Sequence, residues 1–393
     1  MSTTEVCVIG GAGHVGAPLA IVFADKGFRT LIYDLNTSAM ERLAGGEMPF
    51  LEEGGEALLR SALAKKMLSF TSDAAGVGGA QYVIVTIGTP IDEFHNPELG
   101  LVQQCFDSLM PHLSDGQTII LRSTIFPGVT EWVHQYLRDA GKRVHVAFCP
   151  ERVVQGYSIR ELQTLPQIVS GTTPEAEASA ARLFGAIAPK IVNMVPKEAE
   201  FAKLISNAYR YIEFAATNQF YMMVSSAGCD YSRVLAGLRD DYPRATALPG
   251  PGFAAGPCLF KDTLQLAAFM NNTFGLGYAA MQVNEGLPAF VVDRLASQYQ
   301  LSEMTVGVLG MAFKANSDDT RSSLSYKLKK LLQYKAKAVL TTDPLVQTDR
   351  ELLSLEDVIQ RSDLLILGAP HREYKNLDVR GKPIFDIWNF YKG

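Results

Sequence analysis

The chain has 393 residues, of which 47% are hydrophobic and 20% are charged, and its formal net charge is -5. This composition is typical of a globular protein with enough length for two or three domains. The slightly acidic balance, without any long basic run, argues against nucleic acid or an anionic membrane surface as a partner.

No uninterrupted apolar segment is long enough to cross a bilayer, and the first residues lack the basic-then-apolar build of a secretory signal. The five cysteines are scattered along the chain, without the paired spacing of a metal site or a disulfide framework. We therefore expect a cytoplasmic protein in a reducing compartment, without a structural metal.

Apolar runs alternate with amphipathic segments over the first part of the chain. Strands are expected at 5–11, 29–34, 82–88, 117–124, 144–150 and 166–171, with a helix at 15–27. Strands that alternate with helices predict a parallel sheet with helices on both faces.

The pattern changes at Lys197, from which a helical stretch reaches to about Asp240. Residues 197–228 carry apolar side chains at helical spacing and predict one long helix that connects two domains. Helical patterning resumes at 262–275 and 279–298.

From Met304 the first pattern returns, with strands expected at 305–310, 338–344, 363–371 and 383–389. We therefore predict an α/β protein with two Rossmann-like, doubly wound parallel-sheet domains, at 1–196 and 301–393. A central helical region at 197–300 would join them.

The sequence "GGAGHVG" (10–16) follows the first expected strand and opens a helix. It contains the G-x-G-x-x-G pattern at Gly11, Gly13 and Gly16, which permits a tight turn and close approach of a pyrophosphate to the helix N-terminus. Asp34 ends the next strand, where a carboxylate can accept a hydrogen bond from a ribose 2'-hydroxyl and would repel a 2'-phosphate. The combination predicts an NAD site rather than an NADP site.

Polar residues follow three of the other expected strands. They are Thr89, Ser123 with Thr124, and Glu151 with Arg152. Each can be a simple cap or turn residue. However, parallel strands bring their C-terminal ends to one edge of the sheet, where such sheets bind ligands.

The long helix carries Lys203, Asn207 and Arg210, whose spacing places them on one helical face. This stripe is either solvated, as charge on a helix usually is, or faces a pocket.

The stretch "GPGFAAGPCLFKD" (250–262) places Cys258 behind a run of small residues and ahead of Lys261 and Asp262. Small residues allow close approach of a ligand, and a nearby lysine favours the nucleophilic thiolate. The alternative is a tight turn that opens a helix, with Cys258 as a small buried residue.

The sequence "GMAFKANSDDTRSS" (310–323) follows the first strand of the last domain. Lys314 and Arg321 can neutralise phosphates there. Because the glycine fingerprint is absent, this half is expected to hold a different phosphate ligand from the first.

These motifs together resemble the nucleotide-sugar dehydrogenase family, which acts on UDP-glucose, UDP-N-acetylhexosamines or GDP-mannose. The resemblance covers the whole chain through "GAGHVG", "TIGTP", "RSTIFPG", "CPERV", "EFAKLISNAYR", "GPGFAAGPCLFKD" and "GMAFKANSDDTRSS", in that order. It implies an N-terminal NAD domain, a central helix that builds a dimer and a C-terminal UDP-binding domain. The implied reaction is an NAD-dependent four-electron oxidation of the C6 alcohol of a UDP-sugar, for polysaccharide or glycoconjugate synthesis.

The resemblance also implies roles for individual residues. Cys258 would be the nucleophile, and Lys203 with Asn207 would stabilise the oxyanion. Asp262 would order the water and lysine network, and Glu151 would be the general base for thioester hydrolysis. Thr124 would be a further catalytic residue, near the nicotinamide and the water. The implied cofactor contacts are Gly11, Gly13, His14, Val15, Gly16, Asp34, Thr89, Thr124, Lys261 and Arg321. The implied substrate contacts are Glu151, Arg152, Lys203, Asn207, Phe253, Gly256, Lys314 and, from the neighbouring subunit, Arg244.

The sequence departs from the family pattern at Gln155, where the glucose-specific branch carries a second glutamate. "CPERV" and "PGPG" are similar to the N-acetylhexosamine branch, whereas "CLFKD" is similar to the glucose branch. We expect a UDP-N-acetylhexosamine as substrate, with UDP-glucose as the alternative. A two-electron hydroxy-acid dehydrogenase and a non-catalytic nucleotide-binding regulator are further alternatives.

Overall fold

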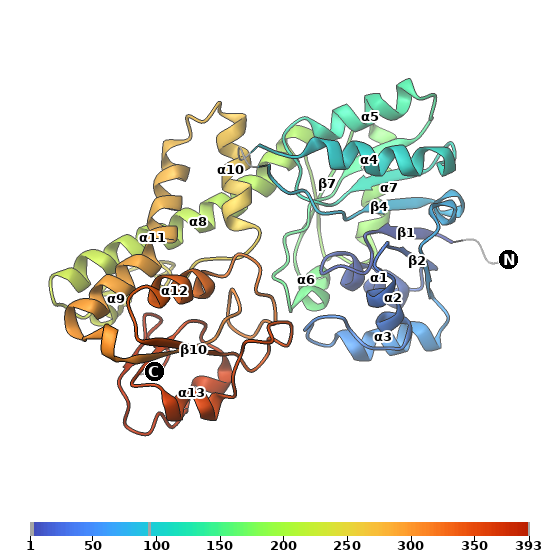
Figure 1. Cartoon of the computed structure of the whole chain (residues 1–393). Helices are drawn as coiled ribbons and strands as arrows, with labels where there is room; N and C mark the ends of the chain where they lie inside the picture. The colour runs from blue at the N-terminus through green and yellow to red at the C-terminus, as the bar shows by residue number, and fades with distance from the viewer. Residues whose placement is uncertain (1–3, 93–95, 392–393) are drawn as a thin grey trace. The chain divides into compact units, whose positions relative to one another are not determined.

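The computed structural model describes residues 4–92 and 96–391. The chain divides into two compact units, Met1–Ile205 and Ser206–Gly393. Figure 1 shows the first unit in blue to green and the second in green-yellow to red. Each unit contains one β-sheet, as the sequence predicts.

The first unit is built on an eight-stranded sheet with the strand order β3-β2-β1-β4-β5-β6-β7-β8. Its strands are β1 Val6–Ile9, β2 Thr30–Tyr33, β3 Leu68–Thr71, β4 Tyr82–Val85, β5 Thr118–Leu121, β6 His145–Phe148, β7 Gln167–Gly171 and β8 Ile191–Asn193. Neighbouring strands are parallel except β6 and β7, which pair antiparallel.

Helices cover both faces of this sheet. They are α1 Gly16–Asp25, α2 Thr37–Ala44, α3 Gly55–Ala64, α4 Leu99–Leu109, α5 Val129–Asp139, α6 Ser158–Thr164 and α7 Pro174–Gly185. The alternation of β1 shows the two layers: Val6 and Val8 pack into one hydrophobic cluster, and Cys7 and Ile9 pack into another. A strand buried on both faces explains why "VCVI" is apolar without a break.

The second unit combines helices with a four-stranded parallel sheet of order β10-β9-β11-β12. The strands are β9 Thr305–Leu309, β10 Ala338–Thr342, β11 Leu364–Leu367 and β12 Ile384–Phe385. The helices are α8 Pro196–Ser226, which starts in the first unit, α9 Tyr231–Arg239, α10 Leu259–Phe269, α11 Gly275–Gln298, α12 Leu324–Gln333 and α13 Leu355–Arg361. None of the helices in the described ranges is long and apolar enough for a bilayer.

Every strand expected from the sequence is present. The expected long helix is α8, and it ends at Ser226. A separate helix, α9, begins after Asp230, whose carboxylate accepts the Ser232 N–H and caps it. The domain limits at 196 and 300 stay a prediction, since the compact units divide within α8.

Candidate active site

The loop between β1 and α1 is shaped by its glycines. A Cβ on Gly11 would lie 2.6 Å from the Val8 carbonyl oxygen, and one on Gly16 would lie 2.5 Å from the Gly10 oxygen. Gly13 differs, because it is exposed and a Cβ there would make only ordinary contact. Gly11 and Gly16 are therefore required for packing, whereas Gly13 leaves the backbone open to a ligand, as the fingerprint predicts.

Asp34 follows β2 and faces this loop. Its Oδ2 accepts the Ala12 N–H at 2.9 Å, and its Oδ1 accepts the Asn36 N–H at 2.9 Å. The side chain is half-buried. The carboxylate is thus fixed beside the glycine loop with capacity left for a ribose hydroxyl, which fits NAD.

Two expected cofactor residues of the same loop lie at the start of α1. Val15 is the residue before the helix, and the ring of His14 packs against Phe50 with centroids 4.0 Å apart. Nδ1 of His14 lies 3.0 Å from the amide nitrogen of Gln155. The residue at which the sequence departs from the glucose branch therefore contacts the glycine loop.

The loops after β4 and β5 meet, as expected from their place in the sheet. The Thr89 hydroxyl donates to the Thr124 carbonyl, and the Ser123 hydroxyl donates to the Ile87 carbonyl at 2.5 Å. Both hydrogen bonds join the same two loops. Thr89 and Thr124 therefore lie side by side at the C-terminal edge of the sheet.

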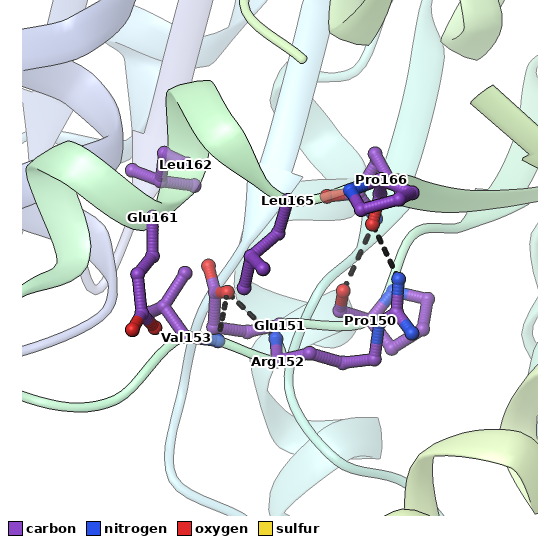
Figure 2. Close-up of a pocket in the computed structure, with 9 residues that line it drawn as sticks. Pro150, Glu151, Arg152, Val153, Glu161, Leu162, Leu165 and Pro166 are labelled. Carbon is purple, nitrogen blue, oxygen red and sulfur yellow. Dashed lines mark hydrogen bonds between the residues drawn. The ribbon is translucent and has the colours of Figure 1, made fainter. Parts of the chain in front are cut away.

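Glu151 follows β6 and is buried by a partner that sequence reasoning missed. Its Oε2 accepts a hydrogen bond from Arg122, whose guanidinium is fully buried and stacks 4.9 Å from the centroid of the Phe184 ring. Its Oε1 accepts the N–H groups of Arg152 and Val153 at 2.7 and 2.9 Å. Figure 2 shows these backbone contacts beside a small cavity between 150–153 and 161–167.

Arg152 is less enclosed than Glu151. It is exposed, and its guanidinium donates to the Pro166 carbonyl across the same cavity.

Within the second unit, Asn207 on α8 meets Asp262 on α10. The Asn207 amide donates to Oδ2 of Asp262 at 2.6 Å, and the Lys261 ammonium lies 2.9 Å from Oδ1. Asp262 is fully buried and Asn207 is 8% exposed. Of the helical stripe, Lys203 and Asn207 are buried, whereas Arg210 is exposed.

The loop before Cys258 is held by two buried asparagines. Asn218 on α8 accepts the Gly252 N–H at 2.9 Å and donates to the Gly252 carbonyl at 3.0 Å. The same amide nitrogen also donates to Asn284 on α11, at 2.9 Å. Both asparagines are fully buried. The two hydrogen bonds between Asn218 and Gly252 therefore fix the backbone of the small-residue loop.

Packing completes the loop. Phe253 is 3% exposed and stands edge-on to Trp388, so a contact with substrate would have to come from its main chain. Gly256 has φ of 110°, and a Cβ there would lie 2.6 Å from the Phe313 ring. Lys314, which follows Phe313 in the chain, is half-buried, and its Nζ lies 5.8 Å from the centroid of the Phe313 ring.

Cys258 is exposed at the start of α10, in contrast to three of the other cysteines. Burial raises the pKa of Cys7 and Cys149 to about 12, and that of Cys105 to about 11. Arg321 is close enough to Cys258 for an electrostatic interaction, and it also makes an ion pair with Asp319 at 2.6 Å. The interpretation of Cys258 as a buried residue is therefore wrong.

Arg244 lies in the segment after α9. It is exposed, and its guanidinium lies 5.9 Å from the centroid of the Tyr242 ring. Among the described residues, no cluster of His, Cys, Asp and Glu has the geometry of a metal site.

Domain profiles of one family match nearly the whole chain. The NAD binding domain of the UDP-glucose/GDP-mannose dehydrogenase family matches residues 4–188, its central domain 197–286 and its UDP binding domain 307–393. The chain belongs to the UDP-glucose/GDP-mannose dehydrogenase family. It is accordingly an NAD-dependent UDP-sugar dehydrogenase. The predicted family, fold class and cofactor are confirmed.

Similar proteins include a UDP-N-acetyl-D-mannosamine dehydrogenase of Pyrococcus horikoshii, 28% identical over 97% of this chain and 95% of that protein. An NDP-N-acetyl-D-galactosaminuronic acid dehydrogenase of Ralstonia nicotianae is 27% identical over 94% and 91%.

The structure of the P. horikoshii UDP-D-ManNAc dehydrogenase superposes with a TM-score of 0.90 at 27% identity, covering 98% of this chain and 96% of that one. A UDP-glucose dehydrogenase of Pyrobaculum islandicum gives 0.91 at 26% identity, covering 100% and 95%.

Proposed function

We propose that this dehydrogenase converts the C6 primary alcohol of a UDP-N-acetylhexosamine to the carboxylate in two oxidations at one site, through Cys258. NAD, when bound, accepts a hydride in each oxidation. The observation that carries the proposal is the exposed thiol of Cys258 on a loop whose backbone is fixed by Asn218. A nucleophile held in place can attack C6 after the first oxidation and keep the same carbon in position for the second.

The thiol allows the second oxidation. The first oxidation removes a hydride from C6, and the hydroxyl proton passes to solvent. The Cys258 thiolate attacks the resulting aldehyde, which forms a C–S bond and, after protonation of the oxygen, a thiohemiacetal. Loss of a second hydride from C6 and of the hydroxyl proton gives a thioester, and water cleaves its C–S bond to release the carboxylate and regenerate the thiol. Covalent capture divides a difficult oxidation into easier steps and retains the aldehyde.

Other residues act on charge and protons. Lys203 and Asn207 oppose the negative charge on the C6 oxygen, and the hydrogen bond from Asn207 to Asp262 supports this role by fixing the amide. Glu151 takes the proton from the hydrolytic water. Its three hydrogen-bond donors support this role by fixing the carboxylate in place.

The choice of sugar rests on several observations. The relatives from P. horikoshii and R. nicotianae carry names of N-acetylhexosamine or N-acetylhexosaminuronic acid dehydrogenases. Gln155 also stands in place of the glutamate of the glucose branch and contacts His14 instead. UDP-glucose is the second candidate, because the P. islandicum enzyme has a comparable fold.

The test is a panel of UDP-sugars with NADH formation and product mass measured together. We expect about two NADH per UDP-N-acetylhexosamine consumed and a uronic acid product. Cys258→Ala should abolish turnover while NAD still binds, and Cys229→Ala, at the other exposed cysteine, should keep full activity. One NADH per sugar with free aldehyde, or an active Cys258→Ala enzyme, would refute the mechanism.

The proposed enzyme is a homodimer. Tyr209, Phe220 and Met223 are 60%, 47% and 60% exposed, and with Ile212 and Ala216 they lie on one face of α8. An apolar stripe of this kind on an exposed helix is typical of a protein interface. Its occupant is a second copy of α8, related by two-fold symmetry.

Arg244 completes the substrate site of the partner subunit in this proposal. Its exposure after α9 leaves it available for that role. The proposed enzyme works in the cytoplasm and supplies uronic acids for polysaccharide or glycoconjugate synthesis.

A further inference from the structure

The two sheets of the chain share a hydrogen-bond pattern around an aspartate. In the first unit, Asp34 after β2 accepts the N–H groups of Ala12 and Asn36. In the second, Asp343 after β10 accepts the Ala312 N–H at 3.0 Å and the Leu345 N–H at 2.8 Å. The two aspartates thus occupy equivalent positions in the two Rossmann-like folds.

Asp343 differs from Asp34 in its surroundings. Its side chain is fully buried and accepts more hydrogen bonds. Oδ2 of Asp343 also accepts the Met311 N–H at 2.7 Å and lies 3.0 Å from Nε2 of His371, and Oδ1 accepts the Val346 N–H at 3.1 Å. Five donors use all the acceptor capacity of a carboxylate, so none remains for a ribose hydroxyl.

His371 connects Asp343 to the loop of Lys314. Nδ1 of this fully buried histidine lies 3.0 Å from the backbone nitrogen of Asn316. A backbone N–H can only donate, so Nδ1 is the acceptor and the ring proton lies on Nε2, from which it donates to Asp343. The Asn316 side chain in turn accepts the Arg372 N–H at 3.1 Å.

The contact with His371 acts on a turn of this loop where the backbone is left-handed. Asn316 has φ of 53°, in the left-handed region that few residues adopt without local support. It lies between Lys314 and Arg321. The position of Lys314, two residues before it, therefore depends on how Asn316 is held.

We propose that His371 is a positioning residue for nucleotide binding: it holds Asn316, and through it the adjoining loop, in the shape that presents Lys314 to a nucleoside diphosphate. The second half thereby recognises its nucleotide without the carboxylate–ribose contact that Asp34 offers in the first. The inference rests on the proposed function, a UDP-sugar dehydrogenase, and on the assignment of Lys314 as a contact of its uridine nucleotide.

Two substitutions of His371 distinguish the contribution of Nε2 from that of Nδ1. In His371→Gln the amide nitrogen can occupy the place of Nε2 and donate to Asp343, but no acceptor faces Asn316. In His371→Asn the amide oxygen can occupy the place of Nδ1 and accept from Asn316, but the donor to Asp343 is lost. Binding of UDP alone and of NAD alone is measured by titration calorimetry, with melting temperatures recorded for each variant.

We expect UDP to bind His371→Gln about tenfold more weakly than the wild type, and His371→Asn within about threefold of it. NAD affinity should be unchanged in both variants. Equal losses of UDP affinity in the two variants, or no loss in His371→Gln, would overturn the inference.

If His371→Gln does not fold, Asn316→Gly and Asn316→Ala test the contact from the loop side. Glycine adopts positive φ readily and alanine does not. We expect the Asn316→Ala protein to bind UDP several-fold more weakly than the Asn316→Gly protein. Equal UDP affinities of the two variants would overturn the inference.

Lys314→Ala distinguishes this inference from the proposed function. If it leaves UDP affinity unchanged, the loop is not the nucleotide site and the inference is wrong, whereas the proposed function stands or falls on the NADH stoichiometry. If it weakens UDP binding while His371→Gln does not, only the role of His371 is wrong.

Discussion

Gln155 connects the loop after β6 to the glycine loop between β1 and α1 through its side-chain amide. Because its side chain lies 3.0 Å from His14, removal of the amide leaves the His14 ring without this partner. We expect Gln155→Ala to raise the Kd for NAD about fivefold, the equivalent of one neutral hydrogen bond of about 1 kcal/mol. Fluorescence titration with NAD measures the change.

The control for Gln155→Ala is Gln104→Ala, at an exposed position on α4. It should bind NAD as the wild type does. A Gln155→Ala enzyme with unchanged NAD affinity would show that the contact with His14 has no part in cofactor binding.

We expect Asp34 to set the choice between NAD and NADP. Its carboxylate would repel a 2'-phosphate and accept a hydrogen bond from a 2'-hydroxyl. Asp34→Ser should lower kcat/KM with NAD about tenfold and raise kcat/KM with NADP from a negligible value. The control is the ratio of kcat/KM with NAD to kcat/KM with NADP, measured on one preparation of each protein. An unchanged ratio in Asp34→Ser would contradict the role of Asp34 in cofactor choice.

Individual residues of the site were predictable from sequence to different degrees. The place of Asp34 followed from the strand that precedes it, and that strand is present. Arg122 was missed, although an arginine at the end of the apolar run "TIIL" has to find a partner when buried. A buried arginine at that place predicts a carboxylate partner. The sequence does not show that this partner is Glu151, because Arg122 and Glu151 lie on different strand ends far apart in the chain.

The Asn218–Gly252 pair joins α8 to the loop that carries Cys258. Asn218→Ala leaves the buried N–H of Gly252 without a partner, at a cost of about 1–3 kcal/mol, whereas the Gly252 C=O keeps its hydrogen bond from the Ala254 N–H at 2.8 Å. We expect a lower melting temperature and a lower kcat, with an unchanged Kd for NAD. Thermal unfolding and steady-state kinetics measure these effects.

Gln219→Ala, at the exposed neighbour of Asn218, is the matched control and should behave as the wild type. Asn218→Ala with normal kcat would mean that the loop keeps its shape without this contact.

At the level of elements, the strands missed from the sequence are the two edge strands of the first sheet, whereas all the others were predicted. β3 and β8 lie at the two edges of the first sheet and are only partly buried. Their sequences "LSFT" and "IVN" therefore lack the apolar run that marks a strand buried on both faces. The end of α8 was predicted to within two residues, but the separate helix α9 was not, since the Asp230 cap becomes evident only once a second helix follows it.

The apolar stripe on α8 determines the assembly in our proposal. Tyr209→Glu places a charge in the stripe, which should convert the dimer to a monomer because a buried unpaired charge is costly. Tyr334→Glu is the matched control, since Tyr334 is 87% exposed outside the stripe. Sedimentation velocity measures the mass, and a dimeric Tyr209→Glu protein would exclude this face.

Arg244 can be tested across the whole assembly by mixing two inactive variants. Arg244→Ala chains and Cys258→Ala chains, dissociated and reassociated together, form mixed dimers with one complete site if Arg244 acts in the partner's site. We expect about a quarter of the wild-type activity to return, the share set by random pairing of two chains. No recovery, with mixed dimers present, would place Arg244 in its own subunit's site.

The uneven burial of the cysteines provides an experimental handle. With three thiols enclosed and weakly acidic, alkylating reagents should act on the folded chain at Cys229 and Cys258. A Cys229→Ser protein would therefore accept a single fluorophore or spin label at the proposed nucleophile. Protection of that label site by UDP-sugar would report occupancy directly, without any turnover.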